Sequence, residues 1–158
     1  MIRTAILTIS DSCAQGTRAD LSGQAIKEML EDGDYELIEM ATVPDDRQTI
    51  ASMLRRYSDE QGVELVLTTG GTGLGPRDVT PEATEDVCER MAPGFSELLR
   101  SEGFKRTPNA ILSRGVAGVR KGTLIVNLPG SPRGVRESLE IILSILPHAV
   151  QMMRGGGH

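Results

Sequence analysis

Three short apolar runs divide the chain. They are AILTI at residues 5–9, VELVL at 63–67 and TLIVNL at 123–128, and polar or glycine-containing turns bound each of them. Because these runs are nearly continuous rather than alternating, they predict strands buried on both faces, as in a parallel sheet between two layers of helices. A fourth run, YELIEMATV at 35–43, contains two glutamates, and we expect it nearer the edge of the sheet.

Apolar residues between the strands recur at helical spacing. One set is Leu21, Ala25, Ile26 and Met29, and a second is Ile50, Met53, Leu54 and Tyr57. Farther along, Thr80 is predicted to be the N-cap of a helix with Pro81 at its first position. Pro93-Gly94 is expected to end that helix before another short helix in FSELLRSEG. This alternation predicts an α/β fold with three layers, α/β/α, and a mostly parallel central sheet in one domain spanning residues 1–158.

The C-terminal part of the chain predicts a hairpin and one long helix. RGVAGVRKGTLIVN is typical of two strands that turn around Lys121-Gly122, which places a β-hairpin at the margin of the sheet. The last helix is expected from about Val135 to Met153, with a stop at the glycines 155–157, and Pro147 is expected to kink it or to remove one internal hydrogen bond. Its apolar residues form two stripes, the first at Val135, Leu139, Ile142, Leu146, Val150 and Met153 and the second at Ile141, Ile145, Ala149 and Met152. One can pack on the sheet, and for the other we favour self-association over deep burial within the monomer.

Composition narrows the range of partners. Aromatic residues make up 3% of the chain, Trp is absent and the formal net charge is -5, so we expect no nucleic-acid surface. The apolar run before Ser10 is too short for a signal peptide or a membrane span. Residues 139–153 include Glu140, Pro147 and His148, which favours a buried helix over a membrane segment. We therefore expect no membrane association and a cytoplasmic location.

Polar residues follow every predicted strand of the parallel set. The segments are Ser10-Asp11-Ser12, Pro44-Asp45-Asp46, TTGGTGLGPRD at 68–78, and PGSPRG at 129–134. Because the carboxyl ends of parallel strands meet at one edge of a sheet, these segments are expected to form one site. Glycines allow successive backbone N–H groups to bind an anion, and Mg²⁺ combines carboxylates with phosphate oxygens. The site is therefore predicted to take a phosphorylated ligand with Mg²⁺ held by Asp45 and Asp78.

The same residues also fit structural roles. Asp45 or Asp46 can cap the following helix, and Arg77-Asp78 can be an ion pair within the loop. The glycine loop lacks the ending of a Walker A sequence and does not match the dinucleotide fingerprint. The histidines, His148 and His158, are far from the loops in sequence, so general-base chemistry by histidine is not expected.

Several motifs taken together resemble the MogA/MoaB family of molybdenum-cofactor biosynthesis proteins. They are TISDS at 8–12, VPDD at 43–46, TTGGTGLGPRDVTPEAT at 68–84, AILSRGVAGVRKGTLIVNLPGSP at 110–132 and RESLE at 136–140. The resemblance extends from about residue 3 to residue 153. It implies an α/β fold assembled as a homotrimer, or in some members as a hexamer. The reaction it implies is the Mg²⁺-dependent adenylylation of molybdopterin by ATP, with release of pyrophosphate.

The resemblance also implies roles for particular residues. Asp45 and Asp78 match the acidic positions on which activity depends, and both are assigned to Mg²⁺ and phosphate. The predicted substrate- and nucleotide-binding residues are Ser10, Asp11, Gly70, Gly71, Thr72, Gly73, Arg77, Ser113, Pro129, Gly130 and Ser131. Ser131 stands where the family often has Gln or Asn, and the chain lacks the C-terminal extension of some members. A pterin-binding carrier without turnover and a hydrolase of another nucleotide-containing metabolite are the alternative functions.

Overall fold

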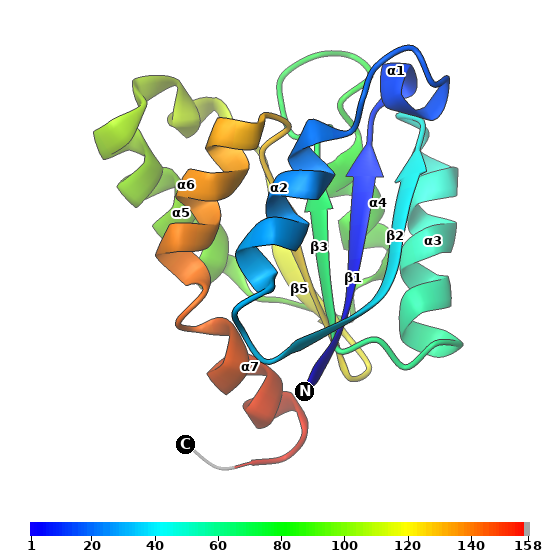
Figure 1. Cartoon of the computed structure of the whole chain (residues 1–158), viewed down its shortest axis with the longest axis vertical. Coiled ribbons are helices and arrows are strands. Elements are labelled where there is room, and N and C mark those ends of the chain that lie inside the picture. The colour runs from blue at the N-terminus through cyan, green and yellow to red at the C-terminus, as the bar shows by residue number, and fades with distance from the viewer. Residues whose placement is uncertain (157–158) are drawn as a thin grey trace.

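A six-stranded sheet in the order β2-β1-β3-β6-β5-β4 forms the middle of the molecule (Figure 1). The structure, a computed structural model, describes residues 1–156. Its strands are β1 (Ile2–Ile9), β2 (Tyr35–Val43), β3 (Leu65–Thr69), β4 (Arg90–Met91), β5 (Ala117–Arg120) and β6 (Thr123–Leu128). Strands β2, β1, β3 and β6 pair in parallel, whereas β6, β5 and β4 pair antiparallel. The mostly parallel sheet, its marginal hairpin and the edge position of β2 are as predicted.

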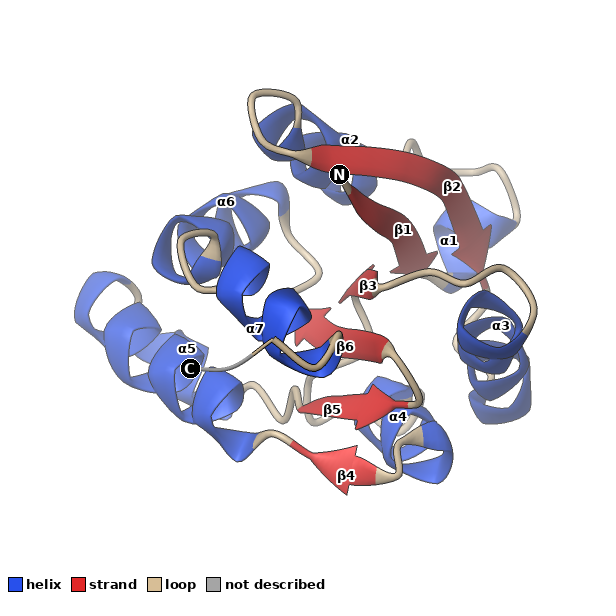
Figure 2. Cartoon of the chain, turned by 90° about the horizontal axis from the view of Figure 1, so that it is seen from below, coloured by secondary structure: helices blue, strands red, loops and turns tan. Residues whose placement is uncertain are grey.

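Helices cover both faces of this sheet (Figure 2). They are α1 (Asp11–Ala14), α2 (Leu21–Leu30), α3 (Arg47–Asp59), α4 (Thr80–Val87), α5 (Pro93–Arg106), the short 3₁₀ helix η1 (Pro108–Leu112), α6 (Pro132–Ile142) and α7 (Leu146–Met153). Helices α2, α5, α6 and α7 lie on one side, and α3 and α4 lie on the other. The three-layer α/β/α arrangement is therefore confirmed.

Alternate residues of the interior strands enter two separate cores. Ile6 of β1 packs in the core beneath α2 and α6, whereas its neighbours Ala5 and Leu7 pack in the core beneath α3 and α4. In β6, Val126 and Ile125 divide in the same way. Successive side chains of a strand point to opposite faces, and a helical layer covers each face here. This double burial explains why the strands are nearly continuous apolar runs.

The prediction of one long C-terminal helix is wrong. Helix α6 ends at Ile142, and α7 begins at Leu146 with Pro147 in its first turn. A continuous helix would require the missing N–H of Pro147 to bond the carbonyl of Leu143, whereas a first-turn proline leaves no such bond unmade. Gly155, with φ of +88°, follows α7 as expected, while Gly157 and His158 lie outside the described residues.

The predicted cap at Thr80 is also wrong. Val79 occupies the N-cap position, and Thr80 is the first residue of α4. The buried Thr80 hydroxyl instead donates a hydrogen bond to the carbonyl oxygen of Gly70, 2.9 Å away. Thr80 therefore holds the glycine loop to the helix that follows it. Within residues 1–156, no helix combines the length and apolar character needed to cross a membrane.

Candidate active site

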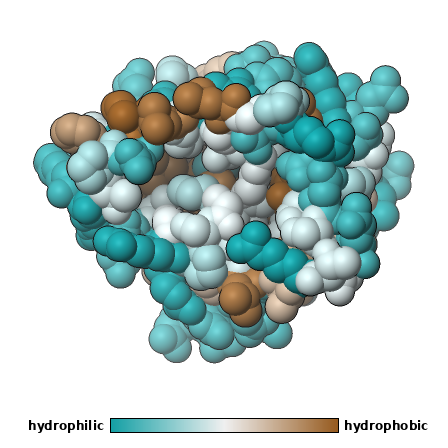
Figure 3. Space-filling model, turned by 90° about the horizontal axis from the view of Figure 1, so that it is seen from above, coloured by the Kyte–Doolittle hydropathy of each residue, from teal (hydrophilic) through white to brown (hydrophobic). Residues whose placement is uncertain are grey.

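The polar segments predicted from sequence do meet at one edge of the sheet. Strands β2, β1, β3 and β6 are consecutive neighbours and run in the same direction, so their carboxyl ends lie along the upper edge in Figure 1. The face above this edge is hollowed (Figure 3). The loops after these strands are the places where a ligand of an open parallel sheet is expected to bind.

The glycine turn after β3 can be built only from glycine at its first positions. Gly70 and Gly71 have φ of +100° and +69°, which residues with a Cβ rarely adopt. A Cβ at Gly70 would overlap the carbonyl oxygen of Ile9, and one at Gly71 would overlap the hydroxyl of Thr80. Gly130, after β6, approaches so closely that its Cβ would lie 3.3 Å from the Cα of Gly70. The two glycine segments therefore pack closely against each other.

Asp11 and Asp45 connect the ends of β1 and β2. The N–H of Asp11 donates to Oδ2 of Asp45 at 2.9 Å, and the N–H of Asp45 donates to Oδ1 of Asp11 at 3.0 Å. Arg77 donates to both oxygens of Asp11, at 2.7 and 3.0 Å. The hydrogen bond from Arg77, with the one from Asp45, lowers the pKa of Asp11. Arg77 thus pairs with Asp11 and not with Asp78, so the proposed ion pair within the loop is wrong.

The capping alternative applies to Asp46 alone. Its carboxylate accepts the N–H of Thr49 at 2.9 Å and caps α3. Asp45, next to it, makes no such contact and stays at the glycine turn, where a Cβ on Gly71 would lie 3.3 Å from its Oδ1. Burial raises the pKa of Asp45, and the negative charges of Asp11 and Asp78 add to that rise.

Asp78 borders the same turn from the other side. Its Oδ2 accepts the N–H of Gly75 at 2.9 Å, and a Cβ on Gly73 would lie 2.9 Å from that oxygen. A nearby cation would stabilise carboxylates that repel one another in this way, so the donor set fits Mg²⁺, which takes one or two carboxylates together with phosphate oxygens. Within the described part of the chain, no group of three or more His, Cys, Asp or Glu is arranged to hold a metal ion alone.

Backbone N–H groups of the turn are free for a ligand. From Gly71 to Leu74, these groups donate to no acceptor among residues 1–156, and the Thr72 hydroxyl also makes no hydrogen bond there. Gly71 lies beside Asp45, and Gly73 lies beside Asp78. A run of unused donors next to carboxylates is suited to an anion that carries its own cation.

A cavity of about 270 Å³ adjoins this turn on the side of α5, η1 and α6. Three predicted residues, Ser113, Pro129 and Ser131, line it together with Asn127 and Arg133. The hydroxyl of Ser131 caps α6 by accepting the N–H of Gly134 at 3.0 Å. A cavity lined by both polar and apolar side chains is the usual kind of site for a small organic ligand, and this one lies beside the polar edge of the sheet.

A smaller cleft of about 40 Å³ lies on the other side of the turn. Ser10, Gly70 and Gly130 line it, and Ser10 also caps α1 by accepting the N–H of Cys13 at 3.2 Å. All of the predicted site residues therefore lie around the glycine turn or in the two hollows beside it.

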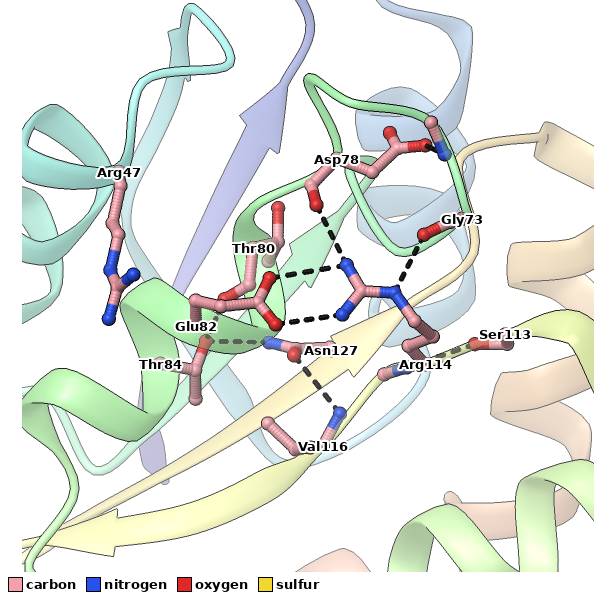
Figure 4. Close-up of polar contacts among 12 residues, drawn as sticks. Arg47, Gly73, Asp78, Thr80, Glu82, Thr84, Ser113, Arg114, Val116 and Asn127 are labelled. Carbon is pink, nitrogen blue, oxygen red and sulfur yellow. Dashed lines mark hydrogen bonds and ion pairs between the residues drawn. The ribbon is translucent and has the colours of Figure 1, made fainter.

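Sequence reasoning missed Arg114, which is central to the site (Figure 4). Its guanidinium donates to the carbonyl oxygens of Gly73 and Asp78 at 2.9 and 2.7 Å, and to both oxygens of Glu82 at 2.7 and 3.2 Å. Its own backbone N–H donates to the carbonyl of Thr72 at 2.8 Å. The only signal in the sequence was its position beside Ser113 in AILSR.

Residues 5–148 match the family described as "Probable molybdopterin binding domain". The chain belongs to this family. It is 45% identical over 156 residues to the molybdopterin adenylyltransferase of Helicobacter pylori strain ATCC 700392 / 26695, covering 98% of this chain and 89% of that protein. The molybdopterin adenylyltransferase of Escherichia coli K12 is 38% identical over 168 residues, covering 98% and 86%.

The fold agrees with that of solved members of this molybdopterin-binding family. The crystal structure of the molybdopterin biosynthesis enzyme MoaB from Thermus thermophilus superimposes with a TM-score of 0.93 at 52% identity, and 98% of each chain is covered. The resemblance to the MogA/MoaB family drawn from the motifs is thus confirmed.

Proposed function

We propose that this protein adenylylates molybdopterin with ATP in molybdenum-cofactor biosynthesis. The observation that carries the proposal is the row of unused N–H groups from Gly71 to Leu74, which lies between the carboxylates of Asp45 and Asp78. Molybdopterin adenylyltransferases at 37% to 45% identity over nearly the whole chain support the same reaction. The adjoining cavity of about 270 Å³ offers room for the pterin.

The reaction requires little acid–base chemistry from the protein. The terminal phosphate of molybdopterin attacks the α-phosphorus of ATP, the bond between the α- and β-phosphates breaks, and pyrophosphate leaves. A phosphate monoester is already a nucleophile, so the protein mainly positions the reactants and neutralises charge. The free N–H groups of the glycine turn would bind phosphate oxygens, as would the Thr72 hydroxyl. A reaction that needs little acid–base catalysis is compatible with a site that has no histidine among its described lining residues.

Asp45 and Asp78 would hold Mg²⁺ in this site. When bound, the ion neutralises phosphate charge and polarises the phosphorus–oxygen bond. The chain's own contribution is to direct both carboxylates at the turn. The hydrogen bonds from Gly75 to Asp78 and from Asp11 to Asp45 serve this purpose.

The direct test is to incubate the purified protein with molybdopterin, ATP and Mg²⁺ and to measure adenylylated molybdopterin and pyrophosphate by mass spectrometry and a coupled assay. We expect equal amounts of both products. Binding of molybdopterin without product, by protein that melts cooperatively, would instead identify a carrier without turnover. Release of AMP in place of the adenylylated pterin would identify a hydrolase.

We further propose a cytoplasmic homotrimer. The second apolar stripe of the C-terminal region supports self-association, because Ile145 and Met152 are 39% and 41% exposed on α7 and its approach. Light scattering coupled to size-exclusion chromatography measures the assembly directly. A monomeric mass at micromolar concentration would exclude the trimer, and twice the trimer mass would show a hexamer.

A further inference from the structure

Arg114 holds one side of the glycine loop at several points. Its guanidinium bonds the carbonyl of Gly73 near the start of the loop and that of Asp78 at its end, and its backbone N–H bonds the carbonyl of Thr72. In Figure 4 the guanidinium lies beneath the loop, with Gly73 and Asp78 above it and Glu82 beside it. A single residue from a distant part of the chain therefore fixes both legs of the loop.

The contacts of Arg114 with the loop carbonyls determine which way the backbone N–H groups of the loop point. In a trans peptide, the C=O of one residue and the N–H of the next point in opposite directions. Because Arg114 binds the carbonyls of Thr72 and Gly73, the N–H groups of Gly73 and Leu74 point away from Arg114. These are among the N–H groups that have no acceptor within residues 1–156.

Glu82 orients the guanidinium. Its two carboxylate oxygens accept from two nitrogens of Arg114, at 2.7 and 3.2 Å, from the first turn of α4. Such a fork-to-fork pair fixes the plane of the guanidinium, which a lysine ammonium cannot reproduce because it is a point charge on a flexible stem. The remaining N–H groups of Arg114 then face the two loop carbonyls.

The backbone that carries Arg114 is fixed from the opposite side. Arg100 of α5 donates to the carbonyls of Ser113 and Gly115, at 3.2 and 3.1 Å. Ser113 and Gly115 line the cavity of about 270 Å³, whereas the Arg114 side chain reaches the glycine loop. Residues 113–115 are therefore a thin wall between the cavity and the loop, anchored on both sides.

We propose that Arg114 is a positioning residue for adenylyl transfer. By binding the carbonyls on one side of the glycine loop, it turns the N–H groups of Gly73 and Leu74 toward the substrate phosphates and fixes the backbone that carries Asp78. The proposal rests on the proposed function. It assigns Arg114 no contact with substrate.

The test compares Arg114→Lys with a matched arginine elsewhere in the fold. Arg120 also forms a two-point ion pair, with Asp59 at 3.0 and 2.8 Å, and also donates to a backbone carbonyl, that of Val87 at 3.0 Å, outside the site. For Arg114→Lys, Arg120→Lys and the parent we would measure kcat, the KM for ATP, the melting temperature, and amide hydrogen exchange of peptides covering residues 70–80.

We expect Arg114→Lys to lower kcat by about tenfold or more, with the KM for ATP changed by less than about threefold, since misplaced groups weaken the transition state more than the ground state. Exchange at the N–H groups of Asp78 and Thr80, which bond within the loop, should become faster. Arg120→Lys should keep kcat and the loop exchange of the parent at a comparable melting temperature. Glu82→Gln, which keeps acceptor oxygen but loses the charge, should show a smaller fall in kcat.

Two results would overturn the proposal. One is an Arg114→Lys protein with the kcat and loop exchange of the parent. The other is a loss of kcat in Arg114→Lys and Arg120→Lys that follows the melting temperature equally, which indicates a structural role only. If Arg114→Lys does not fold, Glu82→Gln is judged by the same criteria. If the parent has no adenylylation activity, the proposed function fails, and loop exchange alone decides whether Arg114 fixes the loop.

Discussion

Asp11 and Asp45 each accept a hydrogen bond from the backbone N–H of the other, at 3.0 and 2.9 Å. The pair joins the carboxyl ends of β1 and β2, and it leaves Oδ1 of Asp45 beside Gly71. One oxygen of Asp45 therefore maintains the fold while the other faces the glycine turn. A substitution at Asp45 can remove its charge without removing its structural hydrogen bond.

Asp45→Asn should separate activity from folding. The amide oxygen of Asn can still accept the N–H of Asp11, so we expect the melting temperature to change by less than about 4 °C. Loss of the charge should lower adenylylation by about a hundredfold or more, as expected when an electrostatic group of the site is removed. Thermal melts and product assays under the same conditions measure both effects.

Asp45→Ala is the companion variant, because it removes the acceptor for Asp11 as well as the charge. It should lose the activity and also melt at a lower temperature than Asp45→Asn. Full activity in Asp45→Asn would remove Asp45 from the proposed role with Mg²⁺ and phosphate.

Gly70→Ala should destabilise the protein strongly. The residue has φ of +100°, and the added Cβ would overlap the carbonyl oxygen of Ile9. We expect a loss of roughly 2 to 4 kcal/mol in the free energy of unfolding, measured by urea denaturation.

Gly94→Ala is the matched control, since Gly94 lies in α5 and a Cβ there meets no atom within 4 Å. Alanine is favoured over glycine in a helix, so this control should be as stable as the parent or slightly more stable. Equal losses in both variants would contradict the steric argument.

The ion pairs of Asp59 predict a pH dependence of stability. Hydrogen bonds from Arg120, and also from Lys121, lower the pKa of Asp59 from 3.8 to about 2. A carboxylate whose pKa is lower in the folded state stabilises the protein above its unfolded pKa, and this contribution disappears as the pH falls through the folded value. The difference in melting temperature between the parent and Asp59→Asn should therefore be constant from pH 7 to about pH 5 and should shrink between about pH 4 and pH 2. A difference in melting temperature that grows on acidification would contradict a lowered pKa of Asp59 in the folded protein.

The two cysteines should differ in reactivity. Burial raises the pKa of the Cys88 thiol from 9.0 to about 11, so its reactive thiolate is about a hundredfold scarcer at pH 8 than that of an unshifted thiol. We expect a maleimide reagent to label Cys13 first, and Cys88 only slowly until the protein is unfolded. Mass spectrometry of partially labelled protein, with Cys88→Ser as the control, identifies the site. Rapid labelling of native Cys88 would show that its thiol is more accessible than the structure indicates.

The sequence predicted those elements whose cause is local or periodic. Strands β1, β3 and β6 were predictable because both of their faces are buried, so their residues are apolar almost without interruption. The shared edge followed from parallel pairing, and it correctly brought Asp45 and Asp78 to the same turn. Strand β4, with only two residues, and the 3₁₀ helix η1 carry too little pattern to be predicted.

The rest depends on contacts between distant residues. Arg114 could not be identified from its spacing because its partners at the loop are main-chain carbonyls, 41 and 36 residues away. Thr80 has the sequence position of an N-cap, but its hydroxyl donates its hydrogen bond to the carbonyl of Gly70 instead. The break between α6 and α7 is not visible in the apolar pattern, because Leu146 and Val150 continue the buried stripe of α6.

The close approach of Gly70 and Gly130 gives the site one rigid side and one adaptable side. A side chain on Gly70 would have to displace the end of β1, and one on Gly130 would press against Gly70, so the glycine edge has little freedom to diverge. The opposite wall, formed by α5 and η1, belongs to the margin of the fold and exposes Phe104, Ile111 and Leu112 on its outer surface. A lineage that acquired a larger or differently substituted pterin would accumulate its changes between residues 93 and 112 and leave the glycine edge intact.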